Sequence, residues 1–152
     1  MKNNKKMIGL YFRQTTEKNE VNDQQIECTR VANQLFGQEI DIICYKDEGS
    51  GTSGNFERNR MLNDVKQGKL DVIITYKVCR ISCTPSYALK IVKQIHNANV
   101  RFFSIMEGEY TTHHTNPIFD MLEDIVQIQS NAHAERIRKA VNFKREGVHN
   151  EK

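Results

Sequence analysis

Arginines follow three of the apolar segments that the sequence predicts to be β-strands. The first segment ends in Tyr11-Phe12-Arg13-Gln14-Thr15-Thr16, the second leads on to Arg58, and the third is followed by Arg80. In an open α/β sheet the loops after the strands gather at one edge, so three guanidinium groups are expected to converge on one crevice. A guanidinium group can bind two phosphate oxygens at once. The pattern therefore favours a phosphodiester-binding site.

Strands and helices that alternate along the chain must position these side chains. The second and third strands are separated by a loop at 46–56 that is rich in glycine and serine. Alternation of this kind predicts an α/β fold with a mostly parallel sheet of four to five strands and helices on both faces. The expected strands lie at 7–12, 40–45, 70–76 and 100–105, and the expected helices lie around 28–35 and 61–65 and from Thr84-Pro85 onward, with Thr84 as the helix cap.

The last predicted element is a long helix. It starts at Asn116-Pro117, and apolar residues recur along it from Ile118 to Phe143, with Gly147 as its expected end. At 1.5 Å per residue it would be roughly 45 Å long, more than so small a domain can cover. One face is expected to pack on the sheet and the other on a second copy of the chain. We accordingly divide the chain into an α/β domain at 1–115, the long helix of the same domain at 116–147, and a tail at 148–152.

The composition excludes several classes of protein. The chain has 152 residues, 38% of them hydrophobic and 27% charged, which is typical of a globular protein rather than a disordered one. Its apolar runs are too short to span a membrane, and its N-terminus does not resemble a secretory signal. We therefore expect a cytoplasmic protein that makes no membrane contact, with its four cysteines reduced.

The net charge of +3 arises in residues 133–152, which hold six basic and three acidic side chains. These charges indicate either a solvated helix end or a surface that faces a polyanion. The six basic residues are Arg136, Arg138, Lys139, Lys144, Arg145 and Lys152.

Several motifs in combination resemble the serine recombinases, the family of resolvases, invertases and large integrases. The resemblance covers residues 7–147. It rests on Tyr11-Phe12-Arg13-Gln14-Thr15-Thr16 after the first strand, a glutamine at Gln24 or Gln25, and Asp47 followed by Ser50-Gly51 or Ser53-Gly54 and then Arg58. It also includes Gly68, Asp71 and Val72 at the start of the third strand and Glu135-Arg136 in the long helix.

The resemblance implies a mechanism and a set of site residues. In this family a serine hydroxyl attacks a DNA phosphodiester, which gives a 5′-phosphoserine link and a free 3′-hydroxyl. Arginines, not a metal or cofactor, stabilise the transition state, and a tetramer in a synaptic complex assembles from dimers. Carried over to this chain, the nucleophile position is Thr15 and the active-site arginines are Arg13, Arg58, Arg80 and Arg136. DNA and further copies of the chain are the implied partners.

Three positions depart from the family pattern. Thr15 stands where the family has serine, and Cys79 and Cys83 stand where it has an aspartate and an arginine. The methyl group of threonine crowds the approach to phosphorus, and the loss of one charge-stabilising group costs roughly 10²–10³ in rate. Two functions follow. The chain is either a recombinase catalytic domain whose activity is weak or lost, or an inactive module that binds DNA or an active recombinase.

Other interpretations rest on the cysteines and on the end of the chain. Cys79 and Cys83 could belong to a redox α/β protein, or to a zinc site with His113 and His114. The glycine-rich loop has no Gly-Lys-Ser/Thr sequence after it and so is not a P-loop. In the resolvases and integrases that this chain resembles, domains that recognise specific DNA sequences follow the long helix. Since none is recognisable after Gly147, we expect weak, salt-dependent binding to DNA phosphates.

Overall fold

A computed structural model describes residues 5–14, 20–49, 55–112 and 116–149. It contains one sheet with the strand order β2-β1-β3-β4-β5. The first four strands pair in parallel and β5 pairs with β4 in the antiparallel direction. The predicted α/β class is thereby confirmed. The strands are β1 (Lys6–Gln14), β2 (Ile40–Glu48), β3 (Val72–Thr75), β4 (Arg101–Ser104) and β5 (Gly108–Glu109).

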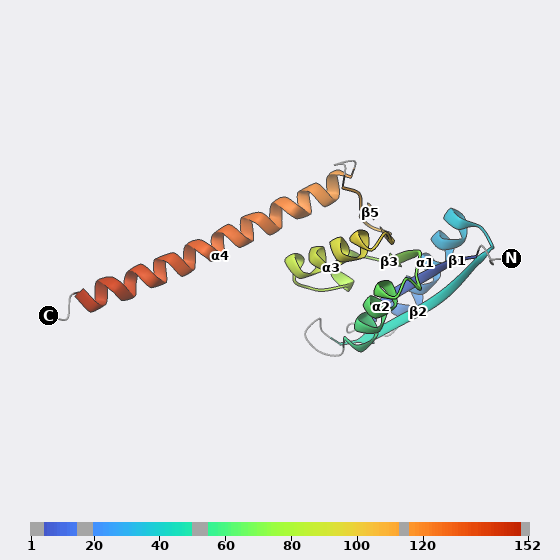
Figure 1. Cartoon of the computed structure of the whole chain (residues 1–152), viewed down its shortest axis with the longest axis horizontal. Helices are drawn as coiled ribbons and strands as arrows, with labels where there is room; N and C mark the ends of the chain where they lie inside the picture. The colour runs from blue at the N-terminus through green and yellow to red at the C-terminus, as the bar shows by residue number, and fades with distance from the viewer. Residues whose placement is uncertain (1–4, 15–19, 50–54, 113–115, 150–152) are drawn as a thin grey trace.

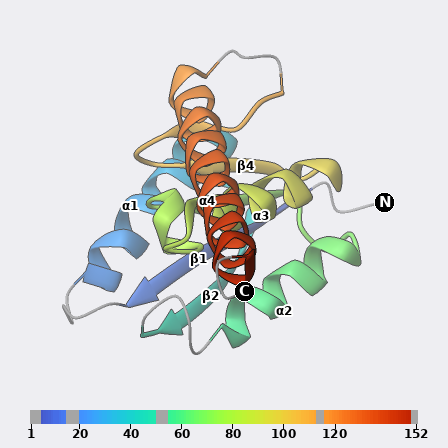
Figure 2. The same cartoon turned by 90° about the vertical axis from the view of Figure 1, so that its left-hand side faces the viewer.

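Helices cover both faces of the sheet, as Figure 2 shows with α1 and α2 on opposite sides of the strands. Alternate residues of β1 explain the two layers. Ile8, Leu10 and Phe12 belong to the core under α1, whereas Tyr11 belongs to the core under α2 and α3. The helices are α1 (Glu20–Phe36), α2 (Phe56–Lys66), the short 3₁₀ helix η1 (Val78–Arg80), α3 (Pro85–Asn97) and α4 (Pro117–His149).

The strand register brings three segments of the chain together at the carboxyl end of the sheet. Arg13 of β1 pairs with Asp47 of β2, two positions beyond the pair that Tyr11 forms with Tyr45. On the other side of β1, Tyr11 pairs with Thr75, the last residue of β3. Arg13 and Asp47 therefore lie where the parallel strands end, beside the segments that lead into α2 and η1.

Asn116 starts α4 in the way that the sequence predicted. Its side-chain oxygen accepts a hydrogen bond of 3.1 Å from the backbone N–H of Ile118, and its amide nitrogen donates to the carbonyl oxygens of Glu107 and Glu109. The two bonds from the amide nitrogen tie the start of the helix to the segment at 107–109, which contains β5. By contrast, the predicted cap at Thr84 is wrong, because its side chain makes no capping hydrogen bond to α3. The backbone N–H of Thr84 donates a hydrogen bond of 3.2 Å to the Ser82 hydroxyl.

The packing of α4 differs from the expected packing on the sheet. Its first turns lie against α3, where Phe119 is buried and its ring contacts that of Tyr110 edge to face at 5.3 Å. The rest of the helix extends away from the sheet and continues past Gly147 to His149 (Figure 1). Glycine is therefore not where this helix ends. None of the described helices is both long enough and apolar enough to cross a membrane.

Candidate active site

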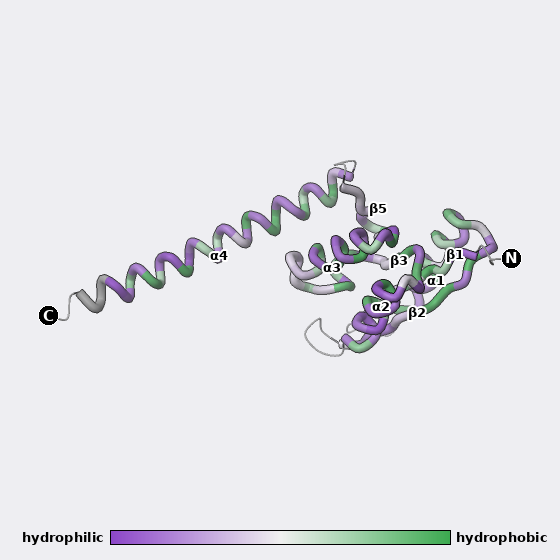
Figure 3. Tube along the Cα trace, viewed as in Figure 1, coloured by the Kyte–Doolittle hydropathy of each residue, from purple (hydrophilic) through white to green (hydrophobic). Residues whose placement is uncertain are grey.

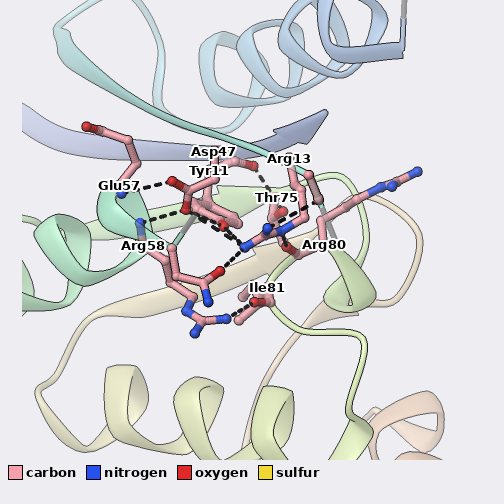
Figure 4. Close-up of polar contacts among 10 residues, drawn as sticks. Tyr11, Arg13, Asp47, Glu57, Arg58, Thr75, Arg80 and Ile81 are labelled. Carbon is pink, nitrogen blue, oxygen red and sulfur yellow. Dashed lines mark hydrogen bonds and ion pairs between the residues drawn. The ribbon is translucent and has the colours of Figure 1, made fainter. Parts of the chain in front are cut away.

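A buried polar network joins β1 to β2 at the end of the sheet (Figure 4). The Tyr11 hydroxyl donates a hydrogen bond of 2.8 Å to Asp47 and accepts one of 2.9 Å from Arg13. Arg13 also lies 3.8 Å from the same carboxylate oxygen of Asp47. Arg13 is 3% exposed and Asp47 is 4% exposed, so their charges compensate each other away from water.

The same environment changes the ionisation of Tyr11. Burial raises the pKa of the Tyr11 hydroxyl, the hydrogen bond to Asp47 raises it further, and the positive charge of Arg13 opposes both effects. Tyr11 is therefore a neutral hydroxyl that donates to a carboxylate. It serves as structural support for the site, not as an acid or base near neutral pH.

Asp47 also determines where α2 begins. One carboxylate oxygen accepts the backbone N–H of Glu57 at 2.9 Å, and the other accepts the backbone N–H of Arg58 at 3.0 Å. These two groups belong to the first turn of α2 and have no partner within the helix. Asn55 occupies the position that precedes the helix, yet its side chain makes no capping bond and instead accepts a hydrogen bond from Arg13. Asp47, a residue of β2, therefore caps α2.

Arg58 is the second buried cation of the site. It is 5% exposed, donates a hydrogen bond of 2.7 Å to the carbonyl oxygen of Ile81, and lies over the ring of Tyr87 at 5.0 Å. Its buried Nε has no hydrogen-bond partner among the described residues. A buried guanidinium N–H without an acceptor is costly, and an anion at this position would satisfy it.

Arg80 enters the network through its backbone. Its carbonyl oxygen accepts a hydrogen bond of 3.2 Å from Nε of Arg13, while its side chain extends away from Arg13 and Arg58 (Figure 4). Partial burial lowers the pKa of Arg80, and the nearby positive charge of Arg13 lowers it further.

The remaining predicted site residues are not part of this network. Arg136 is exposed on α4, about 30 Å along the helix from Pro117 at 1.5 Å per residue. Thr15, the predicted nucleophile position, lies outside the described residues. The structure therefore brings Arg13, Arg58 and the backbone of Arg80 together, and it separates Arg136 from them.

Cys79 and Cys83 lie at the edge of an apolar pocket of about 250 Å³ between η1, α3 and the base of α4. Both side chains are exposed. Partial desolvation raises the pKa of Cys79, and the negative charge of Glu107 adds to this effect. His113 and His114, the other residues of the zinc interpretation, lie outside the described residues, within which no group of three or more metal-binding side chains occurs.

The structure brings further residues into or near the site. The motifs contain Tyr11 and Asp47 but do not reveal their roles, and Asn55 and Tyr87 carry no sequence signal because their partners lie far away in the sequence. The two candidates for the family's glutamine differ in the structure, since Gln24 is buried on α1 and Gln25 is exposed.

The comparisons with known proteins agree with the sequence motifs. Residues 8–149 match the family described as Resolvase, N terminal domain. No curated protein gives a significant match.

Solved structures of recombinases are similar in fold. The N-terminal catalytic domain of TP901-1 integrase has a TM-score of 0.67 at 22% identity, over 84% of this chain and 98% of that chain. A resolvase family site-specific recombinase from Streptococcus pneumoniae has a TM-score of 0.68 at 18% identity, over 93% of this chain and 99% of that chain. The C-terminal catalytic domain of ISC1926 TnpA, an IS607-like serine recombinase, has a TM-score of 0.57 at 16% identity, over 80% of this chain and 79% of that chain.

The family match covers most of the sequence, and the mostly parallel sheet and the long final helix agree with it. The chain belongs to the family of resolvase N-terminal domains.

Proposed function

We propose that this chain is the catalytic domain of a DNA recombinase, acting in the cytoplasm, with Thr15 as its nucleophile and with reduced activity. The Thr15 oxygen would attack phosphorus and form a threonine phosphoester with the 5′ end of the strand. The bond from phosphorus to the 3′ oxygen would break, and this oxygen would leave as a hydroxyl. The reverse reaction would rejoin the strands without ATP, because the phosphoester keeps the bond energy.

The buried Nε of Arg58 is the observation that carries the proposal. The Nε–H group of Arg58 has no hydrogen-bond partner among the described residues. The neighbouring carboxylate of Asp47 already balances the charge of Arg13. Phosphate oxygens are acceptors that a guanidinium group can bind in pairs. Arg58 is therefore the proposed cation for the charge that develops on the phosphoryl group, and the family resemblance adds Arg80 as a second.

DNA and a second copy of the chain are the proposed partners. From its base outward, α4 carries exposed apolar side chains at Met121, Ile125 and Ile128, and Figure 3 shows apolar positions recurring along the helix. A second α4 would cover this stripe, and two such dimers would form the synaptic tetramer. The exposed basic residues near the end of α4 would contact DNA phosphates, and Arg136 is among them.

A paired substitution on α4 tests the dimer. Ile128→Lys should shift the protein toward monomer in sedimentation experiments, because it places a charge in the apolar stripe. Gln129→Lys adds the same charge at the adjacent exposed position and should leave the association unchanged. Equal behaviour of the two variants would exclude a dimer through this face.

Trapping of a covalent adduct tests the chemistry. The protein is incubated with supercoiled plasmid and digested, and mass spectrometry then searches for a nucleotide phosphate on Thr15. The expected result is a low yield of adduct at Thr15 that disappears in Thr15→Ala. The positive control combines Thr15→Ser, Cys79→Asp and Cys83→Arg, and it should cleave faster. Cleavage by this control with no adduct on the natural chain would overturn the proposal.

The cysteines favour a second candidate function. A neutral thiol at position 79, whose pKa is raised, cannot replace the charge of the family's aspartate. This supports an inactive relative that keeps the arginine network in order to bind DNA or an active recombinase. If the protein is such a module, the natural chain and Thr15→Ala should bind DNA equally well, and neither should give an adduct.

A further inference from the structure

We propose that Cys79 and Cys83 form an oxidisable thiol pair, and that their disulfide fixes the short segment that accepts hydrogen bonds from Arg13 and Arg58. Both cysteines stand at positions where this chain departs from the family pattern, and neither has a role in the proposed reaction. The inference therefore does not depend on the proposed function.

The two thiols share one surface of the protein. Cys79 belongs to η1, Cys83 lies two residues before the start of α3, and both line the apolar pocket of about 250 Å³ at the base of α4. Both side chains are exposed, so an oxidant in solution can reach them. They also lie close enough for a negative charge on Cys83 to raise the pKa of Cys79.

The spacing of the cysteines along the chain suits a disulfide. The segment that joins them begins as a helical turn, because Ile81 after η1 also has helical backbone angles. Four residues cover about 6 Å along such a turn, and a disulfide bridges Cα atoms that lie about 4.4–6.8 Å apart. A disulfide adds no atoms to the pocket, so a second α4 packed over the pocket would leave room for it.

The residues between the two cysteines supply two acceptors to the candidate site (Figure 4). The carbonyl oxygen of Arg80 accepts a hydrogen bond of 3.2 Å from Nε of Arg13, and that of Ile81 accepts one of 2.7 Å from Arg58. A bond between the sulfur atoms would close a ring that contains both carbonyl groups. Oxidation at the pocket would thereby restrict the backbone on which two buried arginines depend.

The oxidation balances with hydrogen peroxide as the oxidant. One thiolate attacks a peroxide oxygen, the O–O bond breaks, and the sulfur becomes a sulfenic acid while the released hydroxide takes up a proton. The second thiolate attacks this sulfur, the S–S bond forms, and a second hydroxide leaves and takes up a proton. The two cysteines thus lose two electrons and two protons, and one peroxide gives two molecules of water.

Tryptic mapping of the full chain tests the pair, because trypsin cleaves after Arg80, between the two cysteines. Burial and Glu107 raise the pKa of Cys79, so the protein is oxidised with hydrogen peroxide at mildly alkaline pH, where more thiolate is present. Free thiols are then alkylated, and the monomer is isolated on a non-reducing gel. The peptides 78–80 and 81–90 should appear as one linked species that separates on reduction.

Two serine variants serve as controls for the mapping. Cys83→Ser should give no linked peptides, because the partner thiol is missing. Cys44→Ser removes another exposed cysteine, which lies on β2, and it should leave the linked species unchanged. All three forms are expected to fold, since the substituted side chains are exposed.

Hydrogen exchange shows whether the disulfide fixes the segment. The backbone N–H groups of Arg80 and Ile81 donate hydrogen bonds of 3.0 Å to the carbonyl oxygens of Lys77 and Val78. The closed ring restricts the opening of this turn, so exchange at both amides should become about threefold slower or more after oxidation. The same treatment of Cys83→Ser should change these rates little.

Linked peptides that occur only in a disulfide-bonded dimer would overturn the inference, as would oxidation to sulfinic or sulfonic acids without linked peptides. Equal or faster exchange at Arg80 and Ile81 in the oxidised chain would show that the disulfide does not fix the segment. A missing adduct at Thr15 would sink the proposed reaction, and both measurements on the cysteines would still decide this inference.

Discussion

The hydroxyl of Tyr11 donates a hydrogen bond of 2.8 Å to Asp47 across 36 positions of the sequence. This bond couples the carboxylate that caps α2 to the strand that carries Arg13. The Asp47 carboxylate also accepts the backbone N–H groups of Glu57 and Arg58 in α2. The position of Arg58 therefore depends on Asp47, which lies ten residues before Glu57. These hydrogen bonds therefore stabilise the fold and also position the residues of the site.

Asp47→Asn should destabilise the fold substantially. Asparagine keeps one acceptor oxygen and turns an NH₂ group toward donors, so at least one buried donor loses its partner. We expect the free energy of unfolding to fall by about 2 kcal/mol in urea titrations. Asp64→Asn is the matched control, because Asp64 also accepts a tyrosine hydroxyl, from Tyr45 at 2.6 Å, but is less buried. A loss for Asp47→Asn no greater than for Asp64→Asn would contradict the capping role.

Stability should decline at alkaline pH in a way that depends on Tyr11. Burial and the bond to Asp47 raise the pKa of Tyr11 above its ordinary value of 10. The folded protein therefore holds the phenolic proton more tightly than the unfolded chain does. The resulting stabilisation is fully present below pH 10 and is lost as the pH rises through the folded pKa.

Urea titrations across this pH range should show a flatter decline for Tyr11→Phe than for the natural chain, although Tyr11→Phe is less stable at neutral pH. Tyr45→Phe should remove a separate part of the decline, because burial and Asp64 also raise the pKa of Tyr45. An identical alkaline decline in Tyr11→Phe and the natural chain would refute the assignment.

The fold was predictable where one segment carries its own signal. The run at 70–76 is apolar on both faces, as a central parallel strand must be, and β3 occupies its middle. Asn116-Pro117 predicted the start of α4 because a side-chain cap and an N-terminal proline act locally. Such signals do not depend on the rest of the chain.

The site was predictable only in part, because its contacts join distant segments. Asn55 has the residue type and position of a helix cap, yet its side chain accepts from Arg13 while Asp47 caps the helix. The sequence also gave no reason to separate Arg136 from the other arginines, since the direction of α4 depends on how its base packs against α3. Spacing along the chain cannot reveal contacts of this kind.

Phe119 should fix the base of α4 to the domain. Its ring is 2% exposed and contacts the Tyr110 ring at 5.3 Å. Phe119→Ala should lower the free energy of unfolding by about 3 kcal/mol, because it leaves a cavity in the core. Phe143→Ala, at a side chain that is 77% exposed, should change it by less than about 0.5 kcal/mol. Equal losses for the two variants, measured at low protein concentration, would show that α4 is not anchored at Phe119.

Gln24→Met should stabilise the fold. Gln24 is 1% exposed, and neither atom of its amide has a hydrogen-bond partner among the described residues. Methionine has nearly the same shape without the polar atoms, so the free energy of unfolding should rise by about 1 kcal/mol. Gln25→Met, at the exposed neighbouring position, should have little effect.

The same variant would show whether Gln24 is retained for function. If its amide serves the proposed reaction, Gln24→Met in the background of Thr15→Ser, Cys79→Asp and Cys83→Arg should give less DNA cleavage despite its higher stability. A gain in stability together with a loss of activity is typical of residues kept for function rather than for folding. Destabilisation by Gln24→Met would instead mean that the amide has a partner in the folded protein, and unchanged cleavage would exclude a role for Gln24 in the reaction.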